Sequence, residues 1–271
     1  MRSPQIVRPP QQPRWVSALT WWCAVVVPLC IGVSFAVGTF WPEPMPDFRA
    51  YTAGPDRKSG FFEFIRPLIA EENRRVLSDR ERLEAIASQS ERSIFDRWWL
   101  DALAERYAVD QEALDEQAVM ETLLRRVDVV PMSLALAQAA KESGWGTSRF
   151  TREANNLFGE WCFDEGCGLV PRARARGQSH EVEAFDSPRE SVSSYLRNLN
   201  THDRYRSFRI ERARLREAGE DLSGLALAEE LTQYSARREA YIDEIRNLIK
   251  ANNLAVTRSV ADEADASDAD H

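Results

Sequence analysis

Hydrophobic residues recur at every third or fourth position in three parts of the chain. The three sets are Phe61, Phe62, Ile65, Leu68 and Ile69; Ile94, Phe95, Trp98, Trp99 and Ala102; and Tyr241, Ile242, Ile245, Leu248 and Ile249. Because an α-helix completes a turn in about 3.6 residues, this spacing places each set on one helical face. We therefore predict three helices whose apolar faces contribute to the core.

A fourth helix is predicted to begin at Pro188. Ser187 and Glu190 have the spacing of a capping box, and a proline is favoured at the first helical position. The residues that follow form an apolar stripe of Val192, Tyr195, Leu196 and Leu199. This stripe is predicted to be buried.

The stretch 157–185 departs from the helical pattern. Its helix-breaking residues are Gly159, Gly166, Gly168, Pro171 and Gly177. Closely spaced glycines and prolines are typical of turns and short strands. The chain is therefore predicted to be mainly α, with a short hairpin or irregular lobe over this stretch.

Residues 17–40 contain no charged side chain, and this length is sufficient to cross a bilayer as a helix. Arginines precede the segment and acidic residues follow it, which favours a cytoplasmic N-terminus. We predict a single-pass inner-membrane anchor over 17–41, with 1–16 in the cytoplasm and the remainder in the periplasm. The alternative is a cleaved signal peptide with Ser34 and Ala36 at the cleavage site.

The rest of the chain divides by composition. Prolines and glycines predict a linker over 42–60. A folded domain is predicted over 61–258, and the run of Ala, Asp, Glu and Ser over 259–271 predicts a disordered acidic tail. A chain of 271 residues with 44% hydrophobic residues is long enough for one main domain. Its net charge of -8 argues against nucleic acid as a partner.

Candidate chemistry lies at the end of a further predicted helix, 131–143, which begins at a proline and stops before Gly144. Glu142 falls in its last turn and shares a face with Ala135 and Ala139. The negative end of the helix dipole and partial burial both raise the pKa of a carboxyl group placed there. A carboxylic acid that keeps its proton can protonate a leaving group, although a surface glutamate without a role is the alternative.

Two motifs surround this glutamate. The segments AAKESGWGTS at 139–148 and ANNLFG at 154–159 resemble the glucosaminidase signature of glycoside hydrolase family 73. Further motifs resemble the Bax-type subgroup: Glu160-Trp161-Cys162, Cys167-Gly168-Leu169-Val170-Pro171, Asn198-Leu199-Asn200-Thr201-His202, Arg204-Tyr205 and Tyr234-Ser235. The resemblance covers roughly residues 61–254 and is strongest over 131–205.

The resemblance implies a lysozyme-like helical domain with a small β-lobe and a glycan cleft. It implies an endo-β-N-acetylglucosaminidase-like glycoside hydrolase, acting on the β-1,4 bond after N-acetylglucosamine in peptidoglycan strands, with Glu142 as the general acid. The alternatives are a lytic transglycosylase on the same glycan and a non-catalytic cell-wall-binding anchor. No cofactor is implied.

Aromatic and amide side chains of these motifs are candidates for binding the glycan. They are Phe158, Trp161, Tyr205 and Tyr234, whose rings could stack on sugars, and Asn155 and Asn156, which could bind an N-acetyl group. The alternatives are core positions for the aromatic residues and a turn-stabilising role for the asparagines.

Cys162 and Cys167 are five positions apart in the irregular lobe, and an oxidising periplasm favours a disulfide between them. No metal site is predicted, because the chain has three histidines and none is paired at metal-ligand spacing.

Glycoside hydrolysis usually requires a second carboxylate. The family places a carboxylate in its β-lobe, and Glu181 is the choice there; Glu183 would share its face of a strand. Glu160 follows the second motif closely and is set aside as too near the helix end. A surface glutamate without a catalytic role is the alternative for Glu181.

Overall fold

The computed structural model describes residues 44–255 apart from 173, 175–176 and 236. The predicted segments 1–16, 17–41 and 259–271 lie outside these residues. Within the described part, no helix has both the length and the apolar character needed to cross a membrane. The chain divides into two units at Glu43, and the second unit, from Pro44 onward, is described below.

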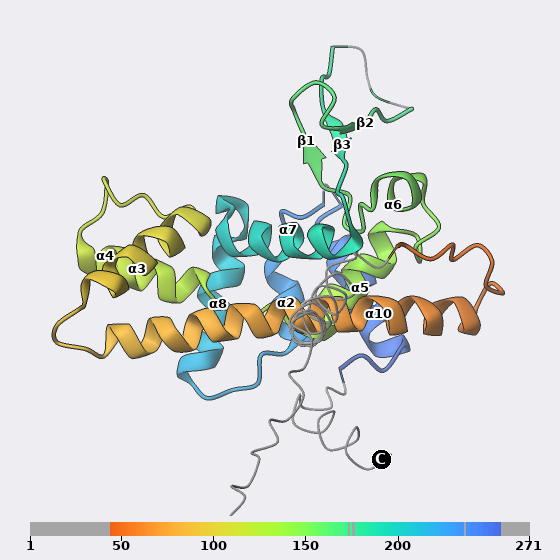
Figure 1. Cartoon of the computed structure of the whole chain (residues 1–271). Helices are drawn as coiled ribbons and strands as arrows, with labels where there is room; N and C mark the ends of the chain where they lie inside the picture. The colour runs from red at the N-terminus through yellow and green to blue at the C-terminus, as the bar shows by residue number, and fades with distance from the viewer. Residues whose placement is uncertain (1–43, 173, 175–176, 236, 256–271) are drawn as a thin grey trace, which may run out of the picture. The chain divides into compact units, whose positions relative to one another are not determined.

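The second unit is mainly helical with one small antiparallel sheet (Figure 1). Its α-helices are α2 (Pro55–Ala87), α3 (Ile94–Arg106), α4 (Glu116–Arg126), α5 (Met132–Glu142), α6 (Arg149–Ala154), α7 (Pro188–Thr201), α8 (Arg206–Glu217), α9 (Gly224–Leu227) and α10 (Glu239–Ala251). Two 3-10 helices, η1 (Asp203–Tyr205) and η2 (Ala228–Glu230), and three strands, β1 (Trp161–Cys162), β2 (Gly168–Leu169) and β3 (Glu181–Glu183), complete it.

The long helix α2 takes part in two separate hydrophobic clusters. Its N-terminal half contributes Phe61, Ile65, Leu68 and Ile69 to the main core around α5. Its C-terminal half contributes Val76, Leu83 and Ile86 to a smaller core with α3 and α4. The apolar face predicted from the sequence over 61–69 is confirmed, and α2 continues well beyond it.

Helix α3 forms where predicted, but of the apolar face predicted to be buried only Trp99 packs against the smaller core. Ile94, Phe95 and Trp98 are exposed, by 56%, 68% and 62%. The opposite stripe contacts the smaller core: Leu100, Leu103, Ala104 and Tyr107. Both stripes have helical spacing, so periodicity identified the helix without identifying the face that meets α2 and α4.

The main core surrounds α5, which contacts α2, α9 and α10. Every residue of α5 from Ser133 to Ala140 is buried. The predicted faces of α7 and α10 are confirmed as part of this core. Ser187 caps α7, because its side chain accepts a hydrogen bond from the backbone N–H of Glu190.

The three strands form a sheet in the order β1-β3-β2, over the stretch predicted as a hairpin or irregular lobe. Trp161 pairs with Val182 in β3, and Gly168 pairs with Glu183. A Cβ atom at Gly168 would lie 2.0 Å from the carbonyl oxygen of Val182, so only glycine fits this position. We call residues 160–185 the β-lobe; Figure 1 shows its strands projecting from the helices beyond α7.

The folded domain begins before residue 61, which corrects the predicted linker over 42–60. Phe48 is fully buried and packs edge-on against Phe61, with ring centroids 5.3 Å apart. Helix α2 itself begins at Pro55, a residue suited to the first turn because its missing N–H would have no helical partner. A large apolar side chain thus holds part of the proline-containing segment in the core.

Candidate active site

Glu142 is the last residue of α5, as the sequence predicts. Two left-handed residues follow, Gly144 and Trp145, and Gly146 also has a positive φ, so the chain reverses tightly after the helix. Gly146 lies against Phe48, where a Cβ atom would approach the ring to 2.1 Å. The helix end is therefore fixed on one side by its own core and on the other by a compact turn.

The carboxyl group of Glu142 is half-buried, and this burial raises its pKa. The negative charge of Glu244 acts in the same direction, whereas the hydroxyl of Tyr241 and the charge of Lys141 oppose it. Lys141 forms an ion pair with Glu244, so part of the positive charge beside Glu142 is compensated. The net effect favours the protonated form, which is the form required of a general acid.

Buried polar side chains support the helix end. The hydroxyl of Tyr195 donates to Oε1 of Gln138 at 2.6 Å, and Nε2 of Gln138 donates to the Tyr241 hydroxyl at 3.0 Å. Gln138 lies one helical turn before Glu142. This connected chain links α5, α7 and α10 directly beneath the candidate acid and restricts the motion of all three elements there.

Glu142 opens onto a cavity of about 1010 Å³. The residues lining it are Arg106, Ala108, Lys141, Glu142, Phe158, Gly159, Glu160, Trp161, Phe163, Glu183, Ser194, Arg197, Asn198, Thr201, His202, Arg204, Tyr205, Gln233, Tyr234, Ser235, Arg237 and Tyr241. A larger hollow of about 1410 Å³ lies at α3 and α4 and contains no residue of the two sequence motifs. The cavity at Glu142 is therefore the candidate active site.

Comparison with known proteins identifies the family of this chain. Residues 117–254 match the model of the glucosaminidase family, described as mannosyl-glycoprotein endo-beta-N-acetylglucosaminidase. The chain is also 38% identical to protein bax of Escherichia coli (strain K12) over 197 residues, which cover 73% of this chain and 70% of that protein. This chain belongs to the glucosaminidase family. It is a glycoside hydrolase, and the sequence-based recognition is confirmed.

A solved structure is also similar to this glucosaminidase. It is the catalytic domain of the autolysin Auto from Listeria monocytogenes, with 21% sequence identity and a TM-score of 0.36. The match covers 65% of this chain and 94% of the autolysin domain.

All four predicted aromatic residues line the cavity of the glucosaminidase domain. Phe158 and Tyr205 are buried, and Phe158 stacks on Tyr195 with centroids 3.8 Å apart. Tyr234 donates to the carbonyl oxygen of Phe158 at 3.2 Å. Trp161 is 58% exposed and stacks on His180. Of the four, Trp161 presents the most accessible ring for a sugar.

The two predicted asparagines do not line the cavity formed by the described residues. Asn155 ends α6 in a left-handed conformation and donates to the carbonyl oxygen of Phe185. Asn156 is buried and bonds to the backbone of Gly159, Glu160 and Glu183. These contacts correspond to the turn-stabilising role that was the alternative to binding an N-acetyl group. The turn that they stabilise contains Phe158, Gly159 and Glu160, which line the cavity.

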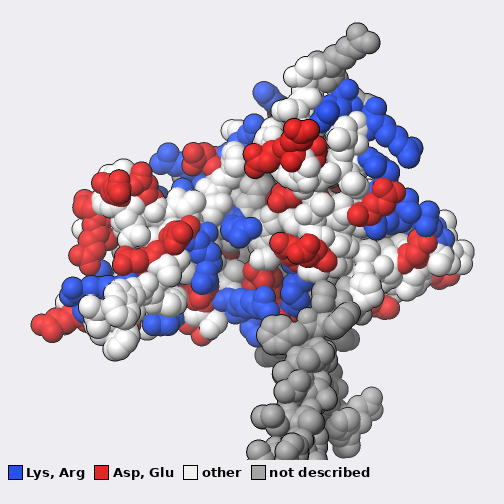
Figure 2. Space-filling view, turned by 45° about the horizontal axis from the view of Figure 1, so that its top comes forward, with Lys and Arg blue, Asp and Glu red and all other residues white. Residues whose placement is uncertain are grey.

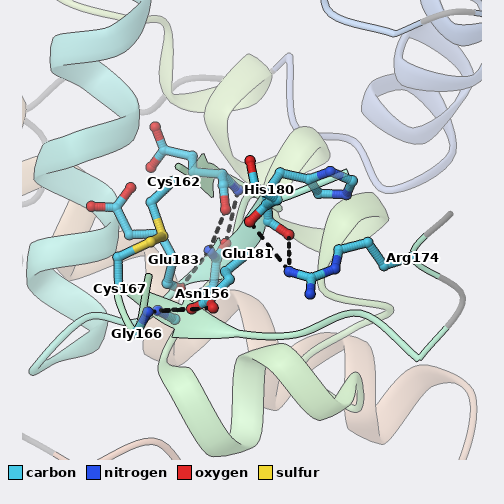
Figure 3. The surroundings of a disulfide bond; sticks show 11 residues. Asn156, Cys162, Gly166, Cys167, Arg174, His180, Glu181 and Glu183 are labelled. Atoms are coloured by element: carbon cyan, nitrogen blue, oxygen red, sulfur yellow. Dashed lines mark hydrogen bonds between the residues drawn. A yellow bond between two sulfur atoms is a disulfide. The ribbon is translucent and has the colours of Figure 1, made fainter. Parts of the chain in front are cut away.

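Glu181 is buried away from the cavity lining. Its two carboxylate oxygens accept hydrogen bonds from the backbone N–H groups of Gly166 and Gly168, at 3.3 and 2.9 Å (Figure 3). The proposed second carboxylate at Glu181 thus finds no support in this geometry. Both of its oxygens are engaged in fixing the loop between β1 and β2.

Two other carboxyl groups of the β-lobe do line the cavity, Glu160 and Glu183. Glu183 lies two positions beyond Glu181 on β3 and is half-buried, and this burial raises its pKa. The carboxyl group of Glu160 is almost wholly buried, and its pKa is raised to about 7. Burial is the main cause, and the negative charge of Glu183 adds to it.

The sequence offered a partial signal for these two residues. Alternation along a strand places Glu183 on the same face as Glu181, which sequence analysis noted. For Glu160, the sequence indicates only a position close to the helix end. A carbonyl oxygen of Glu160 instead accepts from the N–H of Glu183 at 2.9 Å, which brings the start of the β-lobe beside its third strand.

Cys162 and Cys167 form a disulfide in the structure, with their Cα atoms 6.2 Å apart, as the sequence predicts (Figure 3). The bond closes the loop whose N–H groups bind Glu181. Phe163, which lines the cavity and is 70% exposed, lies inside this loop. The disulfide and the buried Glu181 carboxylate together support the part of the β-lobe that carries Phe163.

Both basic and acidic side chains line the cavity. Figure 2 shows basic and acidic side chains interspersed over the face drawn there. In the described part of the chain, no group of three or more His, Cys, Asp or Glu side chains is placed to hold a metal ion.

Proposed function

We propose that this glycoside hydrolase cleaves the β-1,4 bond on the reducing side of N-acetylglucosamine in peptidoglycan. The observation that carries the proposal is the position of Glu142, whose pKa is raised, at the end of a buried helix and at the edge of a large cavity. The substrate is inferred from the resemblance of 139–148 and 154–159 to the signature of family 73, whose members cut bacterial cell-wall glycan.

Glu142 acts in the proposed reaction as the general acid. Its proton passes to the glycosidic oxygen as the bond from that oxygen to the anomeric carbon breaks. A water molecule then attacks the anomeric carbon and loses one proton. The products are two glycan ends, and their formation consumes one water per bond.

Glu183 is the carboxylate proposed to accept the proton of that water. It lines the same cavity as Glu142, and its carboxylate has no hydrogen-bond or ion-pair partner among the described residues. Its partial exposure leaves it able to ionise more readily than Glu160. The two carboxyl groups on α5 and β3 thus divide the acid and base roles.

The test is muropeptide analysis of purified sacculi digested by the wild type and by Glu142→Gln. We expect new reducing ends at N-acetylglucosamine with the wild type. Glu142→Gln should lose about 10²–10⁴-fold in rate, the usual value of general acid catalysis. Glu165→Gln, an exposed glutamate that does not line the cavity, is the matched control.

Two results would contradict the proposal. Products that end in anhydro-muramyl residues would indicate a lytic transglycosylase, in which an internal hydroxyl replaces water. Intact sacculi that bind the protein without cleavage would indicate a cell-wall-binding anchor.

We further propose that the catalytic domain is periplasmic and is held at the inner membrane by residues 17–41. The charge-free segment and its preceding arginines support this topology, and the disulfide suits an oxidising compartment. A reporter fused after His271 should be active only in the periplasm, and the protein should fractionate with membranes. A soluble mature form beginning after Ala36 would contradict the anchor.

A further inference from the structure

Glu160 carries a buried carboxyl oxygen without a hydrogen-bond partner. Among the described residues, none forms a hydrogen bond with Oε2 of Glu160, although the Ser194 hydroxyl on α7 lies near this carboxyl group. Leaving a buried polar atom unpaired costs the free energy of its lost hydration, so such atoms are rare in folded proteins. Here the atom belongs to a residue that lines the cavity beside Glu142.

The other oxygen of the same carboxyl group is engaged. Nδ2 of Asn198, on α7, donates to Oε1 of Glu160 at 3.2 Å. An amide N–H can only donate, so Oε1 acts as an acceptor and a carboxyl proton is placed on Oε2. The unpaired atom is therefore a hydroxyl donor whenever Glu160 is neutral.

The surroundings of Glu160 favour its neutral form. Burial is the largest effect and raises its pKa to about 7; the negative charge of Glu183 on β3 adds to it, while the hydrogen bonds of Asn198 and Ser194 and the charge of Arg197, all on α7, oppose it. Two further titratable groups, the hydroxyls of Tyr195 on α7 and Tyr205 on η1, also interact with it. Below neutral pH the group thus carries its proton.

The position of Glu160 is rigid. Its N–H donates to Oδ1 of Asn156 at 3.1 Å, and its carbonyl oxygen accepts from Nδ2 of Asn156 at 3.0 Å. The preceding residue, Gly159, lies against the candidate acid, because a Cβ atom there would be 3.9 Å from Oε2 of Glu142. A sugar ring bound next to Glu142 therefore also lies beside Glu160.

We propose that Glu160 is a substrate-binding residue whose neutral carboxyl group donates a hydrogen bond from Oε2 to the acetamido oxygen of an N-acetylated sugar in the cavity. This oxygen is the strongest neutral acceptor that such a sugar offers, and it replaces the missing partner of Oε2. The inference rests on the proposed function, because it assigns a substrate contact to the same cavity. It adds a hydrogen bond that recognises the N-acetyl group.

The test measures binding in a Glu142→Gln background, which prevents turnover. The probe is a soluble chito-oligosaccharide, and its de-N-acetylated counterpart is the comparison ligand, both titrated calorimetrically. A second substitution, Glu160→Leu, should weaken binding of the N-acetylated oligomer by about tenfold, the value of one lost hydrogen bond. Binding of the de-N-acetylated oligomer should change by less than about twofold.

Glu160→Gln provides the matched replacement, because its Nε2 is a donor at the place of Oε2 and its Oε1 can still accept from Asn198. We expect Glu160→Gln to bind the N-acetylated oligomer within about threefold of the background protein. Affinity of the background protein should fall as pH rises above about 7. This fall should be absent in Glu160→Gln, whose amide does not titrate.

Thermal unfolding separates a binding role from a structural one. Oε2 of Glu160 forms no hydrogen bond with the described residues, and Glu160→Gln keeps the acceptor for Asn198, so this variant should melt at or above the temperature of the background protein. Glu160→Leu also removes the acceptor for Asn198, so its melting temperature is compared with that of Glu160→Gln. Glu165→Leu, an exposed change in the same lobe, is the control for binding and melting.

Three results would overturn the inference without affecting the proposed function. Glu160→Leu could bind the N-acetylated oligomer as tightly as the background protein does, or it could lose equal affinity for the N-acetylated and the de-N-acetylated oligomers. Glu160→Gln could also lose as much affinity for the N-acetylated oligomer as Glu160→Leu does. A fall in the melting temperature of Glu160→Gln together with lost binding would also reject it, since it would show a structural role. If the Glu142→Gln protein binds neither oligomer and the wild type leaves sacculi intact, the proposed function fails as well.

Discussion

Asn156 holds Glu160 through both ends of its amide. Its Oδ1 accepts from the Glu160 N–H, and its Nδ2 donates to the Glu160 carbonyl oxygen at 3.0 Å. The same Nδ2 donates to the carbonyl oxygen of Glu183 at 2.8 Å. One buried side chain from the second sequence motif thus joins the two β-lobe segments that line the cavity.

Asn156→Ala is expected to destabilise the protein by about 2–4 kcal/mol, because the buried Asn156 side chain gives up four hydrogen bonds to partly buried backbone groups. Activity should fall with it, since the cavity wall loses its support. Denaturant unfolding at neutral pH measures the change. Asn155→Gly is the control: glycine accepts the left-handed φ of 52°, so only the bond to Phe185 is lost and the cost should be smaller. Equal costs for the two variants would contradict the assigned role of Asn156.

Glu142→Gln is expected to increase stability near neutral pH while removing activity. The folded-state pKa of Glu142 is raised, so its contribution to stability is present below its ordinary value of 4.5 and is lost as pH rises through the folded-state pKa. A neutral glutamine avoids this loss. The melting temperature of Glu142→Gln should therefore exceed that of the wild type near pH 7 and converge with it below pH 4.5. A lower melting temperature at neutral pH would indicate that Glu142 stabilises the fold.

Glu183→Gln and Glu181→Gln are expected to affect different properties. Glu183→Gln should reduce the rate of sacculus digestion by more than about tenfold with little change in melting temperature, because Glu183 lines the cavity. Glu181→Gln should lower stability by about 1–3 kcal/mol, because a glutamine accepts the amides of Gly166 and Gly168 less strongly. Rates and melts are compared on the same preparations. If Glu181→Gln lowered the rate without lowering stability, and Glu183→Gln did not lower the rate, Glu181 would again be the candidate second carboxylate.

Asp128→Asn is expected to destabilise the fold by about 3–5 kcal/mol. The carboxylate of Asp128 is buried and pairs with Arg80, Arg212 and Arg216, and Arg212 is itself fully buried. Removing one charge leaves buried arginines without compensation. Chemical denaturation of the variant and the wild type measures this cost.

The same residue should contribute to acid unfolding. The arginines lower the pKa of Asp128, so its stabilising contribution is present above the ordinary value of 3.8 and is lost as pH falls through the lower folded-state value. Asp128→Asn should lose this part of the pH dependence. Asp47→Asn, which removes an exposed pair with Arg49, is the control and should leave stability nearly unchanged.

Replacing both Cys162 and Cys167 by serine is expected to lower stability modestly, by about 2 kcal/mol, because the closed loop is short. The effect should be local to the β-lobe. Hydrogen exchange should increase at Gly166 and Gly168, whose N–H groups bind Glu181, while the α5 amides remain protected. Loss of protection throughout α5 would show that the disulfide stabilises the whole domain.

The sequence by itself determined the features that depend on near neighbours in the chain. The helical spacing of apolar residues located α2, α7 and α10, and the proline and glycine around 131–144 located α5 with Glu142 at its end. The closeness of Cys162 and Cys167 in the sequence, together with the expected oxidising compartment, predicted the disulfide that the structure contains. The two motifs at 139–148 and 154–159 were sufficient to recognise the family.

The tertiary structure decided what depends on distant parts of the chain. Helix α3 has two apolar stripes of equal spacing, and only the positions of α2 and α4 select the one that is buried. Glu181 and Glu183 share a strand face, but Glu181 accepts hydrogen bonds from the amides of Gly166 and Gly168, whereas Glu183 lines the cavity. The carboxyl group of Glu160 finds its hydrogen-bond donor on α7, more than thirty positions later, where Asn198 donates to Oε1. Burial and hydrogen-bond partners set the protonation of a carboxyl group, so its chemical role is fixed only when these segments come together.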